Sequence, residues 1–256
     1  MSKALKKDIS SKQYNYKLTI EYDGKDFLGW QRQSYSKDTI QGHLEDKLEV
    51  LLKEKITLYA AGRTDAGVHA INQIANFKTN QKIQSDKFLY RLNSQLPKSI
   101  TVKKITSVPE KFHARFSAKQ REYIYKISLR RKSIEGNYYC RIFGEPDFKV
   151  IDTLIKFFIG RKSFFPLTKK KEDKHNFICN LNVLTYKYYK SKGEIIFKLR
   201  ADRFLHSMVR CIIGCLIDAG RGNITAEKVK KEFNRGEKIK TQYLPANALF
   251  LNKIYY

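Results

Sequence analysis

Hydrophobic and polar residues alternate along the chain with two different periods, which mark strands and helices. In residues 14–22 every second side chain is Tyr, Leu or Ile, which predicts a half-buried strand. In residues 38–51 apolar residues recur at helical spacing, and Asp38 and Gln41 at the start resemble a capping box. Further predicted elements are strands over 56–60, 73–79 and 100–108 and a second helix that begins at Ser85 and ends near Pro97. This order of strand, helix, strand, strand, helix and strand is a split βαβ unit.

The second half of the chain repeats this order without repeating the sequence. Its predicted elements are strands over 121–129, 181–189, 194–201 and 249–255, and helices over 147–159, 204–219 and a short extra one over 225–234. We therefore expect an α+β protein with two split-βαβ halves, of the ferredoxin-like or RNA-recognition-motif type, whose antiparallel sheets face a basic cleft. The expected parts are a basic flexible tail at 1–13, an N-terminal half at 14–110 with a glycine-containing loop at 60–70, and a C-terminal half at 111–256.

A large positive charge changes this picture most. The chain has 51 Lys and Arg against 25 Asp and Glu, a formal net charge of +26, which suits a polyanionic partner. Nucleic acid is the favoured partner. An anionic membrane surface is the alternative, but the basic residues are spread along the chain and form no long amphipathic helix. The 16 Tyr and 16 Phe residues could stack on unpaired RNA bases, although most of them are expected in the core.

Cysteine usage and the apolar segments predict a reduced, cytoplasmic protein that does not span a membrane. The four cysteines form no CxxC pair and have no metal-type spacing with histidine. Residues 1–12 are polar and rich in Lys, unlike a secretory signal. The most apolar segment, 205–219, contains Arg210 and is too short to cross a bilayer.

The loop at 60–70 carries the most concentrated candidate chemistry. Gly62 and Gly67 permit a tight turn, and Asp65 between them lies two residues from Arg63. A carboxylate on such a turn can be kept ionised by a positive neighbour, which would suit catalysis. An ordinary turn with a surface ion pair is the alternative, because most Asp residues near Gly are turn residues.

Two residues from the C-terminal half are candidates to complete a site around Asp65. Arg210 is a cation inside an otherwise apolar helix, so it needs a partner, and a carboxylate in a cleft would supply one. Alternatively, this arginine pairs with a structural carboxylate or extends its charged end into solvent. Tyr123 follows basic residues early in its strand and could stack on a base while its hydroxyl reaches a catalytic group. Such a tyrosine is more often part of the core.

The remaining candidates favour RNA contact over metal binding. Between the halves, aromatic and basic side chains are mixed as in RNA-contacting loops, although an interdomain linker would look the same. The RNA-contact candidates of this segment are Phe112, His113 and Arg115. His69, His113 and His206 could join Asp65 in a metal site, but they lack the spacing of a metal-binding pair. We therefore expect no metal site.

Residues 62–70 resemble the catalytic motif of the TruA-type tRNA pseudouridine synthases. Further segments resemble other blocks of that family and follow in the same order. They are Glu21-Tyr22-Asp23-Gly24, Gly29-Trp30-Gln31-Arg32-Gln33, Phe112-His113-Ala114-Arg115-Phe116-Ser117-Ala118, Tyr123, Phe204-Leu205-His206 and Met208-Val209-Arg210. The resemblance extends from about Tyr14 to the last residue, and such a series is far more specific than a lone Gly-Arg-x-Asp.

The resemblance implies the pseudouridine synthase fold, a homodimer, and tRNA as the substrate, with uridines 38, 39 and 40 of the anticodon stem-loop as targets. It implies that Asp65 is the essential aspartate acting on a flipped-out uridine and that Arg63 helps to occupy the vacated space. Arg210 would pair with Asp65, and Tyr123 would stack on the target base and serve proton transfer. The N1–C1′ bond is broken and the uracil rejoined through C5, with no metal or nucleotide cofactor. Covalent addition by Asp65 and abstraction of a sugar proton both stay open.

Residues 160–167 depart from the family pattern, which usually has Gly-x-x-Asp-Phe-x-Ser-Phe here. The acidic residue and the Ser-Phe pair are missing from their expected places, so the RNA contacts of the lysine-rich loop 161–180 and the set of modified uridines stay open. A non-catalytic RNA-binding protein is the main alternative, because RNA-recognition modules share the split βαβ order, although the chain lacks their RNP1 signature. A metal-dependent nuclease or deaminase that uses Asp65 and the histidines is a second alternative.

Overall fold

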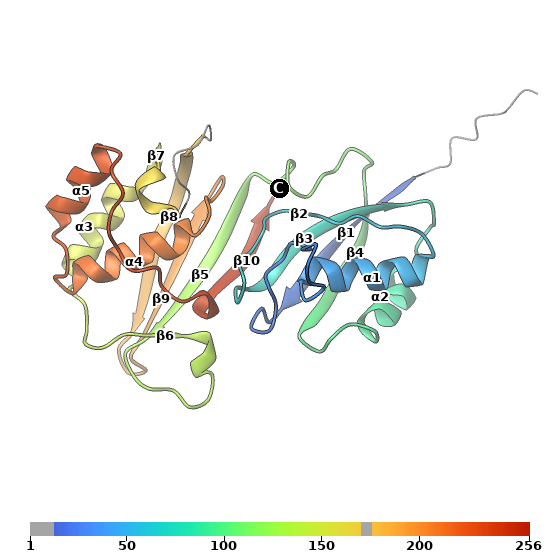
Figure 1. Cartoon of the computed structure of the whole chain (residues 1–256), viewed down its shortest axis with the longest axis horizontal. Coiled ribbons are helices and arrows are strands. Elements are labelled where there is room, and N and C mark those ends of the chain that lie inside the picture. The colour runs from blue at the N-terminus through green and yellow to red at the C-terminus, as the bar shows by residue number, and fades with distance from the viewer. Residues whose placement is uncertain (1–12, 170–175) are drawn as a thin grey trace, which may run out of the picture.

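One mixed sheet passes through both halves of the molecule in the computed structural model, which describes residues 13–169 and 176–256. Its strands follow the spatial order β4-β1-β3-β10-β5-β9-β8-β7, with β2 paired to β3 and β6 paired to β5. The strands are β1 (Tyr14–Tyr22), β2 (Tyr59–Ala60), β3 (His69–Thr79), β4 (Ile100–Val108), β5 (Gln120–Ser128), β6 (Cys140–Arg141), β7 (Gly160–Ser163), β8 (Ile178–Tyr189), β9 (Glu194–Ala201) and β10 (Leu249–Tyr255). The helices are α1 (Ile40–Leu52), α2 (Ser85–Asn93), α3 (Phe148–Phe158), α4 (Met208–Gly220) and α5 (Ala226–Asn234), with short 3-10 turns at Gly136–Tyr138, Phe165–Leu167 and Ala246–Ala248. Figure 1 shows α1 and α2 beside the N-terminal strands and α3, α4 and α5 beside the C-terminal strands.

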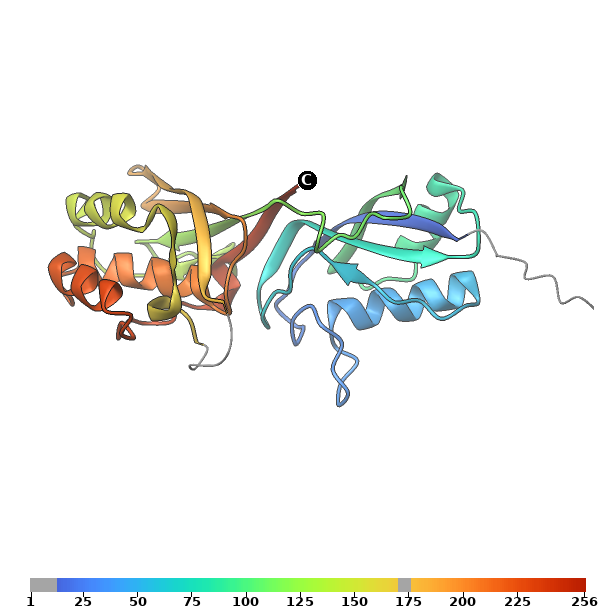
Figure 2. The same ribbon diagram turned by 90° about the horizontal axis from the view of Figure 1, so that it is seen from above.

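The two halves are joined by β10, which lies between β3 and β5. It pairs in parallel with β3, where Phe250 is opposite His69, and antiparallel with β5, where Leu249 is opposite Tyr125. Figure 2 shows this red strand at the junction, between the helices of the two halves. The expected α+β fold of two split-βαβ halves is therefore confirmed, and the structure adds that their sheets are continuous.

Four strands have the predicted bounds. This holds for β1, β4, β9 and β10. By contrast, β3 begins at His69 instead of residue 73, because its first residues pair with β10. The predicted loop 161–180 contains most of β7 and the start of β8, which pair with each other. The expected tail, apart from residue 13, and residues 170–175 of that loop lie outside the described residues.

Helix starts differ from the sequence prediction where several polar residues compete for the capping position. Thr39, not Asp38, caps α1, and its hydroxyl accepts a hydrogen bond from the backbone three residues later at 3.1 Å. Ser85 is the first residue of α2, and Gln84 before it makes no side-chain capping bond. Thr225 caps α5 as predicted. For α1 and α2 the sequence thus predicted a helix correctly but not its capping residue.

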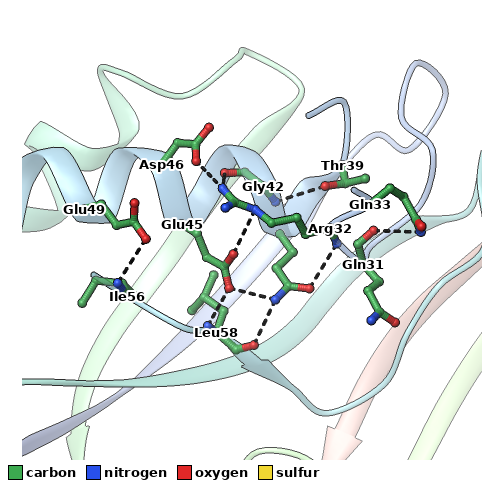
Figure 3. Close-up of polar contacts among 11 residues, drawn as sticks. Gln31, Arg32, Gln33, Thr39, Gly42, Glu45, Asp46, Glu49, Ile56 and Leu58 are labelled. Atoms are coloured by element: carbon green, nitrogen blue, oxygen red, sulfur yellow. Dashed lines mark hydrogen bonds and ion pairs between the residues drawn. The ribbon is translucent and has the colours of Figure 1, made fainter. Parts of the chain in front are cut away.

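A buried carboxylate on α1 fixes the chain segment that leads into the loop at 60–70 (Figure 3). Glu45 is 4% exposed, and its Oε1 accepts hydrogen bonds from the Leu58 N–H at 2.9 Å and the Gln41 side chain at 2.8 Å. Arg32 Nε lies 3.3 Å from Glu45 Oε2, and the same guanidinium pairs with Asp46. Because a buried carboxylate needs such partners, the cluster ties together the loop before α1, the helix and the segment before β2.

The cysteines are core residues. All four cysteines are free and buried. Burial raises the pKa of Cys211 and of Cys215 to about 12, which keeps both thiols protonated. Among residues 13–169 and 176–256, no helix combines the length and apolar character needed to cross a membrane.

The close approach of Gly24 to Val68 generates a prediction for stability. A Cβ atom at Gly24 would clash with the Val68 carbonyl oxygen, so the turn after β1 has no room for a side chain. Gly24→Ala should lower the free energy of unfolding by about 1–3 kcal/mol, measured by urea denaturation. Gly136→Ala is the control, because the nearest atom to its Cβ would be the Lys132 Cβ at 3.7 Å. Equal losses in both variants would contradict this prediction.

Candidate active site

The candidate residues of both halves meet in one cleft of about 960 Å³. Its lining includes most of the aspartate loop, which we define as residues 61–68 between β2 and β3, together with Tyr123 and residues 203–209 of the C-terminal half. The arginines that line it are Arg63, Arg115, Arg121 and Arg203. Among the described residues of this lining, Asp65 is the only acid. The cleft is therefore strongly basic around a single carboxylate.

The backbone of the aspartate loop is held in place by buried hydrogen bonds. The Thr64 hydroxyl lies 2.7 Å from the Tyr22 hydroxyl, and the Thr64 carbonyl accepts a bond from the Trp30 N–H at 3.1 Å. Earlier in the loop, the buried Gln73 amide donates to the Gly62 carbonyl at 2.7 Å. Burial raises the pKa of Tyr22, so its hydroxyl stays protonated. The residue that follows Thr64 thus has a fixed backbone position.

Arg121, at the start of β5, positions the aspartate loop against the C-terminal half, and the sequence analysis did not single it out. Its guanidinium donates to four backbone carbonyls, those of Ala61 at 3.0 Å, Arg115 at 2.7 Å, Ala118 at 2.9 Å and Asp202 at 2.8 Å. Burial lowers the pKa of this arginine. In the sequence it looks like any cation near a strand start, so only the fold reveals its contacts.

The Asp65 carboxylate is contacted by side chains of the C-terminal half and not by the arginine of its own loop. Arg210 Nη1 lies 3.7 Å from Asp65 Oδ2, and His206 Nε2 lies 3.7 Å from Asp65 Oδ1. Arg210 also donates from Nε to the Leu244 carbonyl. The structure thus brings Arg210 to Asp65, whereas the ion pair considered for Arg63 and Asp65 is not formed.

Ser207 contacts the same carboxylate from a strained backbone position. Its Oγ donates to Asp65 Oδ2 at 3.2 Å, and its φ is 57°, in the left-handed region. Such a conformation costs a non-glycine residue about 1–2 kcal/mol and tends to persist where function requires it. It also explains why α4 begins at Met208 and not at residue 204. The sequence carried no signal for this role, since a serine before a helix is ordinary.

Tyr123 lies buried on β5, and its hydroxyl is turned toward the aspartate loop at Gly62. Its ring packs edge-on against Phe204, with centroids 5.1 Å apart. Burial, together with the negative charge of Asp65, raises the pKa of Tyr123. The hydroxyl is therefore protonated at neutral pH and able to donate a hydrogen bond.

Arg63 is the cation of the aspartate loop itself. Its side chain is exposed and lines the cleft. Within the described residues it forms no ion pair, in contrast to Arg210, whose Nη1 lies 3.7 Å from Asp65. Its guanidinium is therefore available to a ligand in the cleft.

The linker between the halves contributes only part of its RNA-contact candidates to the cleft. His113 and Arg115 line it, and Phe116 lies beside them. Phe112 is not in the lining and packs against Tyr256, with ring centroids 5.1 Å apart. Partial burial and the charge of Arg115 lower the pKa of His113, whose Nδ1 accepts a hydrogen bond from the Arg115 N–H.

His69 lies at the end of the aspartate loop and outside the cleft lining. Its Nε2 is 3.0 Å from the Asn247 carbonyl oxygen, and its Nδ1 is 3.0 Å from the Gly24 nitrogen and 2.9 Å from the Asp23 carboxylate. The ring stacks on Phe250. Burial lowers the pKa of His69 despite the nearby Asp23. In the described ranges, no cluster of three or more His, Cys, Asp or Glu could hold a metal ion.

Comparison with known proteins gives one consistent result. A family model described as tRNA pseudouridine synthase matches residues 18–117 and 154–256. The chain is 36% identical to the tRNA pseudouridine synthase A of Chlorobium phaeobacteroides, over 94% of this chain and 93% of that protein. It is 39% identical to that of Pelodictyon phaeoclathratiforme, over 82% of this chain and 86% of that protein. The protein of the same name from Thermodesulfovibrio yellowstonii is 34% identical, over 94% of this chain and 99% of that protein.

The lowered pKa of buried His69 predicts how stability depends on pH. The ordinary pKa of histidine is about 6.5, so below it the unfolded chain takes up a proton that the folded protein resists. The free energy of unfolding should therefore decrease as pH falls from about 6.5 through the lowered pKa, by at most about 1.4 kcal/mol per pH unit from this group. His69→Gln should flatten the slope, measured by urea denaturation at several pH values.

A second histidine provides the control for this measurement. His43→Gln removes a histidine from α1, away from the contacts of His69. It should leave the slope that His69 causes in place. A slope that is unchanged in His69→Gln would contradict the proposed cause.

Proposed function

The chain belongs to the tRNA pseudouridine synthase family, and we propose that it isomerises uridines of the anticodon stem-loop of tRNA to pseudouridine, with positions 38, 39 and 40 as targets. The observation that carries the proposal is the single carboxylate of Asp65 in a cleft lined by four arginines. RNA is attracted by the cations, and the acid is placed where a flipped-out base and its sugar can enter.

The reaction rearranges bonds within one nucleotide. The N1–C1′ bond breaks, the uracil turns, a C5–C1′ bond forms, and the proton on C5 is lost while N1 gains one. The substrate and product therefore have the same composition, and no oxidant, reductant or co-substrate is consumed. An ionised Asp65 either adds to the substrate or abstracts a sugar proton.

The surroundings of Asp65 support distinct roles for its neighbours. Arg210 and Ser207 hold the carboxylate in a fixed orientation, through contacts at 3.7 Å and 3.2 Å. Tyr123 offers an aromatic face for the target base and a protonated hydroxyl for proton transfer. Arg63 forms no ion pair with any residue that the structure describes, and it can occupy the space that the flipped uridine leaves in the RNA.

The resemblance to the TruA-type enzymes also supports a homodimer located in the cytoplasm. Analytical ultracentrifugation of the pure protein tests the homodimer. The sedimentation coefficient of a monomer at micromolar concentration would exclude the dimer.

Asp65→Asn should abolish turnover and retain RNA binding. The amide keeps the shape of the side chain and loses the charge, so pseudouridine formation in unmodified tRNA should fall by at least about 10³-fold. The dissociation constant for tRNA should stay within about threefold of the parent value. Asp26→Asn removes the same charge from an exposed site outside the cleft lining and is the matched control. Measurable turnover by Asp65→Asn would overturn the assignment.

The readout should map pseudouridine position by position in the tRNA, with and without EDTA. Product confined to positions 38 to 40 is expected. A parent protein that binds tRNA but forms no pseudouridine would favour the non-catalytic alternative, and EDTA-sensitive strand cleavage or base deamination would favour the metal-dependent one.

Arg210→Ala should reduce turnover and stability together. Asp65 loses its cation, so kcat should fall by roughly 10²-fold, and the free energy of unfolding should fall by about 1–3 kcal/mol because the Leu244 carbonyl also loses its hydrogen-bond donor. Arg203→Ala is the comparison, since Arg203 also lines the cleft but has no ion pair with Asp65. It should affect KM more than kcat. Equal kinetic profiles of the two variants would argue against a special role of Arg210.

A further inference from the structure

An exposed row of aromatic rings lies on the lining of the cleft. Phe116 is 77% exposed, and its ring centroid is 4.4 Å from that of His113. The His113 ring is in turn 5.0 Å from the half-exposed ring of Tyr59. All three residues line the cleft that contains Asp65. The row therefore borders the same space into which the target uridine enters.

Hydrogen bonds fix the backbone of the segment that carries Phe116 and His113. The buried Ala114 N–H donates to the Asn76 side chain at 2.8 Å, and its carbonyl accepts from the Tyr256 hydroxyl at 3.1 Å. Arg121 donates to the Arg115 carbonyl, and Ser117 closes the turn by a backbone bond to His113 at 2.8 Å. A ring that is exposed on a backbone fixed in this way loses little entropy when a ligand covers it.

Charge and chemistry identify the ligand. The Arg115 guanidinium lies 5.6 Å from the centroid of the Phe116 ring, so a cation adjoins the apolar face. Aromatic faces beside arginines are the usual binding surface for unpaired bases of single-stranded RNA, where the ring takes the base and the cation the backbone. Tyr59 lies on β2, directly before the aspartate loop.

We propose that Phe116, supported by His113 and Tyr59, is a stacking platform for one unpaired nucleobase next to the target uridine in the RNA strand. This inference rests on the proposed function and adds a subsite to it. Phe116 holds the neighbour of the flipped nucleotide, so that the target sugar is presented to Asp65 in one orientation. Phe112, which packs on Tyr256, takes no part in the platform.

Kinetics of three variants at Phe116 test the platform. Phe116→Ala should raise KM for an unmodified anticodon stem-loop by about 5- to 150-fold, with a smaller change in kcat, because base–aromatic stacking is lost. Phe116→Leu should behave like the alanine variant, and Phe116→Trp should restore KM to within about threefold of the parent. The side chain is largely exposed, so all three variants should fold, which thermal unfolding will check.

The chain offers a matched control in Phe143. This ring is 66% exposed and lies under the Arg141 guanidinium at 4.5 Å, as Phe116 lies beside Arg115, but it is outside the cleft lining. Phe143→Ala should leave KM unchanged. Equal KM values for Phe116→Ala and the parent would overturn the platform. A rise in KM for Arg115→Ala but not for Phe116→Ala would also overturn it, because it would indicate phosphate contact without stacking.

Fluorescence provides a readout that does not need turnover. The chain has one tryptophan, the buried Trp30. Phe116→Trp therefore adds an exposed indole, whose emission should be quenched when a stem-loop binds to the Asp65→Asn form, whereas Phe143→Trp should show no quenching. Absence of quenching at Phe116→Trp in an RNA-bound sample would overturn the proposal.

The possible failures can be distinguished. If the parent protein forms no pseudouridine, the proposed function fails, while the quenching experiment still tests base stacking. If the parent is active and Phe116→Ala changes the sedimentation coefficient instead of KM, the platform is a protein contact and the proposal is wrong.

Discussion

The pairing of β10 with both β3 and β5 is the constraint on which the candidate site depends. Asp65 and Arg63 come from the N-terminal half, whereas Arg210, Ser207 and Tyr123 come from the C-terminal half. Strand β10 pairs with β3 of the first half and with β5 of the second. Because backbone hydrogen bonds fix the register on both sides, contacts such as the 3.7 Å approach of Arg210 to Asp65 are set by the sheet and not by a mobile hinge. The Arg121 guanidinium reinforces this junction through four carbonyls.

Electrostatics acts at two distances in this protein. The net charge of +26 attracts a polyanion from solution. Within the cleft, arginines surround the carboxylate of Asp65, which is the only acid among the described residues of the lining. Acids elsewhere are placed where they serve structure, as Glu45 does by accepting hydrogen bonds beneath the strand segment that leads to the aspartate loop.

The sequence predicted what depends on local periodicity and left out what depends on distant pairing. The local pattern of β1, β4, β9 and β10 was sufficient for their bounds, and one cation in the apolar segment of α4 made Arg210 a candidate partner of Asp65. The early start of β3 could not be seen, because His69 becomes part of a strand only through β10. The roles of Arg121 and Ser207 were not predicted for a related reason, because their partners are backbone and carboxylate groups that only the fold brings together. At α1, Asp38 and Thr39 are both good caps, and only the backbone geometry selects between them.

The position of β10 has a consequence for the order of folding. His69 and Asn247, which contact each other at the junction, are 178 residues apart in the chain. Closing so long a loop costs entropy before the contact stabilises anything, so topologies of this kind fold slowly. On a ribosome, the N-terminal half emerges with the edge of β3 uncovered, and it must wait for residues beyond 247 before that edge is paired. The cleft is thus completed late in synthesis, and a nascent chain that already carries Asp65 does not yet have the second half of the site.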